Sequence, residues 1–195
     1  MAKKNRPFTD HPKIIDLQVA NGLDMGRVLH SNVIATDIID YIATEMRIKL
    51  VNYIKEVKPK ISVLIDESTT VSNLSTLIIY LRGLFDNAEE PITIFFGLVE
   101  LSKATADGIR SDLLNYFESC GLDRLLLQEI WIGICTDGAS VMLGKHSDVA
   151  TLLKEEFKNI VVTWHCLAHR LELAVGDTVA EVTSVNHFKL FLGTL

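Results

Sequence analysis

Apolar residues recur every four positions along residues 31–58, which predicts one long amphipathic helix. The members of this stripe are Ile34, Ile38, Ile42, Met46, Leu50 and Ile54. Ser31 or Asn32 is suited to cap the helix N-terminus through a side-chain oxygen, and Pro59 closes the helical region. We expect the stripe to lie on a core. The polar residues 1–30, which prolines and glycines interrupt, are expected to form an irregular lead-in.

Beyond Pro59 the pattern changes to short apolar runs rich in β-branched residues, which is typical of strands. Strands are predicted over residues 61–66, 76–85, 92–101, 130–137 and 160–166. Helices are predicted over residues 105–121, 147–157 and 168–182. The acidic turn at residues 86–91 joins two apolar runs and indicates a hairpin.

The resulting order, β-β-β-α-β-α-β-α, predicts an α/β fold with a mixed five-stranded sheet flanked by helices. It is the order of the ribonuclease H-like fold, whereas flavodoxin-like folds lack the opening meander of three strands. The strands are almost continuously apolar, so we expect both faces of the sheet to be buried. The domain boundary is predicted between a lead-in with its helix, residues 1–58, and a ribonuclease H-like domain, residues 59–195.

Composition narrows the class of protein. The chain has 195 residues, 48% hydrophobic and 23% charged, with a formal net charge of -6. This charge argues against a chain-wide nucleic-acid-binding surface. Three cysteines without framework spacing indicate a reducing compartment. The polar N-terminus is no signal peptide, and no apolar run is long enough to span a bilayer. We therefore expect an intracellular protein, not secreted and without a membrane partner.

Two predicted strands end in an aspartate. Asp66 follows "VLI" and Asp137 follows "IGICT". If these strands are neighbours, both acids lie at the ligand-binding edge of the sheet. Two carboxylates that close repel one another unless a cation lies between them, and either Mg²⁺ or Mn²⁺ suits such oxygen ligands. The alternative is that both aspartates simply cap turns. Glu67 points to the opposite face from Asp66 if the strand continues.

Two other motifs resemble a phosphate-binding loop and a zinc site, but neither matches fully. "GASVMLGK" invites a phosphate-loop interpretation, but the spacing of Gly138 and Gly144 is one residue too long and Lys145 lacks a following hydroxyl. We therefore expect no nucleotide cofactor. Cys166 and His169 have helical spacing but no partner pair for zinc, so no zinc site is expected. Their position after the last strand brings His169 and Arg170 to the edge with the aspartates, where they could meet a phosphate.

The motifs "LIDEST", "CTDGASVMLGK" and "HCLAHRLELA", in this order, resemble the catalytic core of hAT-superfamily transposases. The lead-in "NRPFTDHPKIIDLQVANGLDMG" resembles that of domesticated vertebrate hAT-derived proteins, one of which is named a SUMO ligase. The resemblance implies a ribonuclease H-like fold with a D-D-E trio that holds divalent metal. By that resemblance Asp66 is the first acid and Asp137 the second. Cys166 and His169 match a C-x-x-H motif that contacts DNA, and Arg170 and Lys145 complete the expected contact set.

The third acid of the trio is a glutamate that follows a long helical insertion in this family. Glu172 and Glu181 come too early to match it, and the sequence ends about where that insertion would begin. We therefore expect a transposase-derived domain in a nuclear host protein, not catalytic alone, with residual DNA or divalent-metal contacts. The alternatives are a protein-interaction module, including one in the SUMO pathway, and a phosphoryl-transfer enzyme completed by residues outside this chain.

Overall fold

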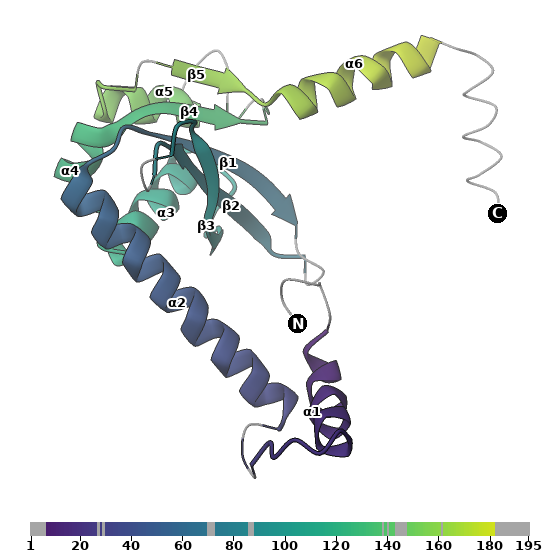
Figure 1. The fold of residues 1–195 in the computed structure, drawn as a ribbon. Coiled ribbons are helices and arrows are strands. Elements are labelled where there is room, and N and C mark those ends of the chain that lie inside the picture. The colour runs from purple at the N-terminus through teal and green to yellow at the C-terminus, as the bar shows by residue number, and fades with distance from the viewer. Residues whose placement is uncertain are drawn as a thin grey trace. The chain divides into compact units, whose positions relative to one another are not determined.

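The fold is seen in a computed structural model, which describes residues 7–26, 28, 30–69, 73–85, 88–137, 139, 141–142, 148–160 and 162–181 (Figure 1). The chain divides into two compact units, residues 1–53 and residues 54–195. The first unit holds a short 3-10 helix, η2 (Phe8–Asp10), helix α1 (His11–Ala20) and most of helix α2 (Asn32–Val57). None of the described helices is both long enough and apolar enough to cross a membrane.

The prediction of an irregular lead-in is wrong for residues 11–20, which form α1. Pro12 lies in the first helical turn, where its missing N–H leaves no hydrogen bond unmade. Proline therefore opens this helix and does not interrupt it. The two glycines that follow adopt positive φ angles, +82° at Gly22 and +68° at Gly26, and they turn the chain after the helix.

Helix α2 confirms the long helix predicted from the apolar stripe. The Ile34 amide donates to Ser31 Oγ at 3.2 Å, so Ser31 is the cap, as one of the two predicted choices had it. The expectation that the whole stripe lies on a core is wrong in the middle of the helix, where Ile42 and Met46 are exposed. Near the end of the helix, Val51 and Ile54 are buried.

The second unit is built on a five-stranded mixed sheet in the order β3-β2-β1-β4-β5. The strands are β1 (Ile61–Thr69), β2 (Ser75–Gly83), β3 (Ile92–Glu100), β4 (Trp131–Thr136) and β5 (Val162–His165). The first three pair antiparallel, whereas β1–β4 and β4–β5 pair parallel. This topology confirms the predicted fold class and the hairpin between β2 and β3. It also makes β1 and β4 neighbours, which is the condition under which the two aspartates meet.

Four helices accompany the sheet: α3 (Ala106–Ser119), α4 (Arg124–Ile130), α5 (Val149–Glu156) and α6 (Leu167–Glu181). Side-chain caps begin three of them, at Thr105, Asp123 and Asp148. The cap of α5 is Asp148, whose Oδ1 accepts from the Thr151 amide. Helix α4 was not predicted, because seven residues are too few to show a helical period.

The core lies between one face of the sheet and helices α3 to α5. A row of rings crosses it from Phe96 through Phe117 and Trp131 to Phe157, with successive centroids 5.7, 5.8 and 5.3 Å apart. Burial alternates along β1, where every second residue from Ile61 to Ile65 is buried and the residues between them are partly accessible. The expectation that both faces are buried is therefore wrong: the apolar side chains of the second face remain partly accessible.

Candidate functional site

The sheet register brings Asp66 and Asp137 to the same place. The β1–β4 ladder ends with Leu64 opposite Cys135, and each aspartate lies two residues further along its own chain. Asp137 follows the last residue of β4, as predicted. Asp66 is not a strand end, because β1 continues to Thr69 through its pairing with β2. The antiparallel neighbour thus extends β1 beyond the point where its parallel neighbour stops.

Because β1 continues past Asp66, the direction of the Glu67 side chain is fixed by strand alternation. Alternation places Asp66 on the partly accessible face with Ser62 and Leu64, and Glu67 on the opposite, helix-covered face. Glu67 therefore does not join the aspartates, in agreement with the expectation from the sequence.

The charges of the two aspartates interact. Desolvation by burial, followed by the negative charge of Asp137, raises the pKa of Asp66, and the charge of His169 partly opposes this rise. Asp66 is nevertheless classed among the exposed residues. Its carboxyl group is thus accessible to a ligand while its ionised form is disfavoured by its surroundings. Such a carboxylate is stabilised by any cation that binds beside it.

Asp137 also has a local role. The Ala139 amide donates to Asp137 Oδ1 at 3.0 Å, which closes a turn of the Asx type after β4. The turn-capping interpretation and the binding interpretation are therefore compatible, since a carboxylate oxygen that accepts one amide keeps further acceptor capacity.

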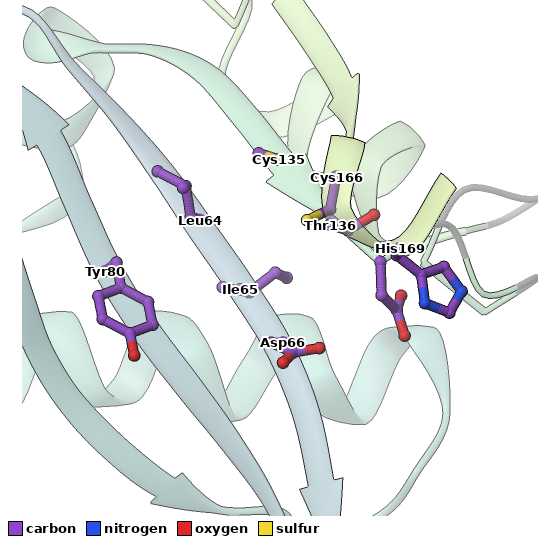
Figure 2. A pocket seen from close by; sticks show the side chains of 9 residues that line it. Leu64, Ile65, Asp66, Tyr80, Cys135, Thr136, Cys166 and His169 are labelled. Carbon is purple, nitrogen blue, oxygen red and sulfur yellow. The ribbon is translucent and has the colours of Figure 1, made fainter. Parts of the chain in front are cut away.

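A cavity of about 340 Å³ joins the two aspartates to the C-x-x-H motif. Nine residues line it, among them Asp66, Asp137, Cys166 and His169 (Figure 2). Figure 2 shows Asp66 on β1, Tyr80 on β2, and Cys166 and His169 at the junction of β5 and α6. A backbone hydrogen bond of 2.8 Å from the Cys166 amide to the Thr136 carbonyl holds this junction against β4. His169 lies in the first turns of α6, with its ring centroid 5.7 Å from that of His165.

The structure therefore brings together four of the six predicted site residues. Arg170 is exposed on α6 and does not line the cavity. Lys145 lies outside the described residues. Within the described part of the chain, no three His, Cys, Asp or Glu side chains are placed to share a metal ion. The carboxylate pair is thus a two-ligand arrangement.

Sequence reasoning missed Cys135 and Tyr80, which also line the cavity. Cys135 lies two residues before Asp137, so strand alternation alone would have placed both on one face. Burial raises the pKa of the Cys135 thiol, and the neighbouring Cys166 adds to the rise. The thiol is thereby held in its protonated form.

The fold and the acidic cavity define an α/β domain of the RNase-like class. The family described as the ZMYM1/FAM200, RNase-like domain (DUF4371) matches residues 9–147, more than two thirds of the chain. The chain belongs to this family, a hAT-transposase-related domain. The matched range includes Asp66, Asp137 and Lys145, whereas Cys166, His169 and Arg170 follow it.

Proposed function

We propose that this domain binds a divalent cation, Mg²⁺ or Mn²⁺, between Asp66 and Asp137 and uses it to contact DNA, without completing a catalytic site alone. The domain would act within a nuclear host protein. One observation carries the proposal. Two neighbouring parallel strands deliver two carboxylates to one cavity, where desolvation by burial and then the charge of Asp137 raise the pKa of Asp66.

The donor set fits a hard cation. Both groups are carboxylates, and Mg²⁺ is commonly bound by one or two carboxylates together with waters and phosphates. The two thiols in the same cavity would favour softer metals, but burial keeps the Cys135 thiol protonated. When bound, the cation would neutralise phosphate charge and polarise a phosphorus–oxygen bond. Asp66 and Asp137 would hold it, and His169 would stand at the wall of the cavity.

The absence of catalysis is a separate part of the proposal. The catalytic site of the transposases that the sequence resembles has three acids, and only Asp66 and Asp137 are assigned to it here. Glu172 and Glu181 are on α6, with side chains outside the described part of the structure. A two-carboxylate site still binds a cation and a phosphate, although it has no third group to orient the attacking water.

DNA contact would extend from the cavity along the start of α6. Cys166 and His169 line the cavity, and Arg170 is exposed one residue further on. An exposed guanidinium beside a metal-bound phosphate adds a second, salt-sensitive contact. Lys145, by its place in the sequence between β4 and α5, would add another.

The metal part is tested by calorimetric titration with Mn²⁺. We expect one binding event that Asp66→Asn and Asp137→Asn each abolish, because each removes half of the ligand set. Gln128→Glu on α4, which adds a carboxylate elsewhere, is the control and should leave the event unchanged. Binding that is indifferent to both aspartate substitutions would refute the site. Nuclease or strand-transfer activity above that of the Asp66→Asn/Asp137→Asn double variant would refute the non-catalytic part of the proposal.

The DNA part is tested by mobility shift at several salt concentrations. We expect Arg170→Ala and Lys145→Ala each to weaken binding and to reduce its salt dependence, since each removes a phosphate contact. A shift that survives both substitutions unchanged would refute the proposed contact surface.

A second candidate, a protein-interaction module, is favoured by the apolar surface of α6. Leu167, Leu171, Leu173 and Val175 are all at least half exposed on this helix. Exposed apolar side chains on a helix are typical of a surface that a partner covers. The resemblance of the lead-in suggests the SUMO pathway as one source of a partner. Calorimetric titration with purified SUMO tests this candidate. Binding heat that is the same for the wild type and for Leu171→Ala would count against α6 as the interaction surface.

A further inference from the structure

A second cavity lies beside the carboxylate cavity on the same face of the sheet. Its volume is about 400 Å³, and strands β1, β2, β4 and β5 all contribute to its lining. Leu64, Cys135 and Cys166 line both cavities. The two are thus halves of one continuous depression, which we call the sheet groove. One half contains the aspartates, and the other contains Arg82 and Trp164.

A glycine lies in the lining of the second half, where the strands approach closely. Ser62, Gly133 and Val162 are neighbours across β1, β4 and β5. Gly133 carries no side chain, and a Cβ atom built there would lie 2.7 Å from Ser62 Oγ. The Ser62 hydroxyl therefore occupies the space that a side chain at position 133 would need, and glycine lets these strands pack without a clash.

An exposed indole forms part of the wall. Trp164 of β5 lines the groove and is 52% exposed, whereas the other tryptophan, Trp131, is fully buried in the core. Trp164 is paired with Cys135, which places it one strand away from the centre of the groove. An accessible aromatic face beside a hollow of this size is a stacking surface for a planar ligand, and nucleobases stack on such faces irrespective of sequence.

The charges of the groove suit a phosphate chain. Arg82 lines the second half and is exposed, with one hydrogen bond of 2.8 Å from its Nη1 to Thr93 Oγ1. The residues that line this half include no carboxylate. At the other end, Asp66 lies four residues beyond Ser62 on β1, about 13 Å away at the usual rise of a strand. A cation at the aspartates would make both ends of the groove attractive to phosphate.

We propose that the sheet groove binds single-stranded DNA, with an unstacked base against Trp164 in the second half and phosphates near Arg82 and the aspartates. Only the contact at the aspartates rests on the proposed function. A duplex does not meet these requirements, because its bases are stacked on one another and not free to stack on the indole.

The experiment measures binding of a dye-labelled oligothymidylate by fluorescence anisotropy, with and without Mn²⁺. We expect Trp164→Ala to weaken binding about tenfold or more, the range found for loss of one base–aromatic stack. Trp164→Phe keeps an aromatic ring and should retain most of the affinity. Leu125→Ala, an exposed apolar residue of α4 at 80% exposure, is the matched surface control and should bind like the wild type.

Tryptophan fluorescence supplies a second readout. Because Trp131 is fully buried, the difference in emission between wild type and Trp164→Phe reports Trp164. We expect the oligonucleotide to quench this difference emission. An unquenched signal together with equal affinity of wild type and Trp164→Ala would overturn the proposal, and so would equal affinity for the matching duplex. Tighter binding of oligouridylate would overturn DNA as the ligand.

Failure of this inference is distinguishable from failure of the proposed function. In Asp66→Asn without metal, the Trp164-dependent quenching should persist, because the stack does not need the cation. Its loss in that variant would contradict the two-ended groove. If Mn²⁺ binding is absent but the quenching remains, the groove proposal is supported and the metal site is refuted. If Mn²⁺ binds at the aspartates but the Trp164 emission is never quenched, the metal site is supported and the groove proposal is refuted.

Discussion

Asp66 of β1 and Asp137 after β4 lie close enough for the negative charge of Asp137 to raise the pKa of Asp66. Desolvation contributes more to this rise, and the charge of His169 opposes it. The relationship follows from the parallel register of two strands that are separated in sequence by a hairpin and two helices. A fold that holds two carboxylates in this way disfavours their joint ionisation unless a cation is bound.

We predict that Asp137→Asn lowers the pKa of Asp66, because the substitution removes the second-largest cause of its rise. Carboxyl-carbon NMR titration of Asp66 measures this directly. His169→Ala should move the pKa the other way, since the His169 charge lowers it. Shifts of the same sign in both variants would contradict the described charge arrangement.

The raised pKa of Asp66 predicts a pH dependence of stability. In the folded protein Asp66 binds its proton more tightly than in the unfolded chain, where its ordinary value is 3.8. Its contribution to the free energy of unfolding is therefore fully present below pH 3.8 and is lost as the pH rises through the raised folded-state pKa. Asp66→Asn, which cannot ionise, should gain stability relative to the metal-free wild type across this window.

Urea unfolding of both proteins at a series of pH values tests this. Other acids titrate in both proteins, so the quantity of interest is the difference between them. A difference that does not change with pH would show that Asp66 ionises without cost. Saturating Mn²⁺ should reverse the sign at neutral pH, because the cation stabilises the ionised wild type.

Gly97 on β3 is predicted to be intolerant of any side chain. A Cβ atom there would lie 1.8 Å from Tyr116 Oη, whose hydroxyl donates to the Phe96 carbonyl at 3.3 Å. Gly97→Ala should lower the free energy of unfolding by about 1–3 kcal/mol through overpacking. Gly176→Ala is the control, because among the described residues nothing beyond its own helix backbone lies within 4 Å of a Cβ there, and alanine favours the helix. Urea unfolding that ranks the two variants in the opposite order would refute the packing of α3 on β3.

Occupation of the sheet groove should protect two of the three cysteines. Cys135 and Cys166 line both halves of the groove, whereas Cys120 ends α3 elsewhere. With saturating oligothymidylate, iodoacetamide should modify Cys166 and Cys135 more slowly and Cys120 at an unchanged rate, as followed by peptide mass spectrometry. Cys135 should be slow even without ligand, because its raised pKa leaves little thiolate. Equal rates at Cys166 with and without oligonucleotide would contradict occupation of the groove.

Much of the second unit follows from local pattern. The β-branched runs, the acidic hairpin turn and the later alternation of strand and helix predict the fold class and the hairpin, whereas the adjacency of β1 and β4 is seen only in the sheet topology. Adjacency in turn brings Asp66 and Asp137 together. The periodicity of a strand and the position of its last apolar residue are local properties, so a sequence is sufficient to predict them.

The features that were missed depend on tertiary context. Pro12 is interpreted as a helix breaker, because the sequence alone does not show that it lies in the first turn of α1, where proline is tolerated. The accessibility of the second sheet face could not be predicted either, because an apolar run has the same sequence pattern whether one or both faces of the strand are covered. Trp164 and Arg82 come to line one cavity only through the sheet register, which places Arg82 opposite Ser62 and Trp164 opposite Cys135.

Paramagnetic broadening by Mn²⁺ tests whether a cation binds between Asp66 and Asp137. Backbone amide NMR spectra recorded with substoichiometric Mn²⁺ report which residues lie near the bound ion. We predict that broadening centres on Asp66, Asp137 and His169 and disappears in Asp66→Asn. Broadening centred on a surface carboxylate such as Glu89, and unchanged in Asp66→Asn, would contradict it.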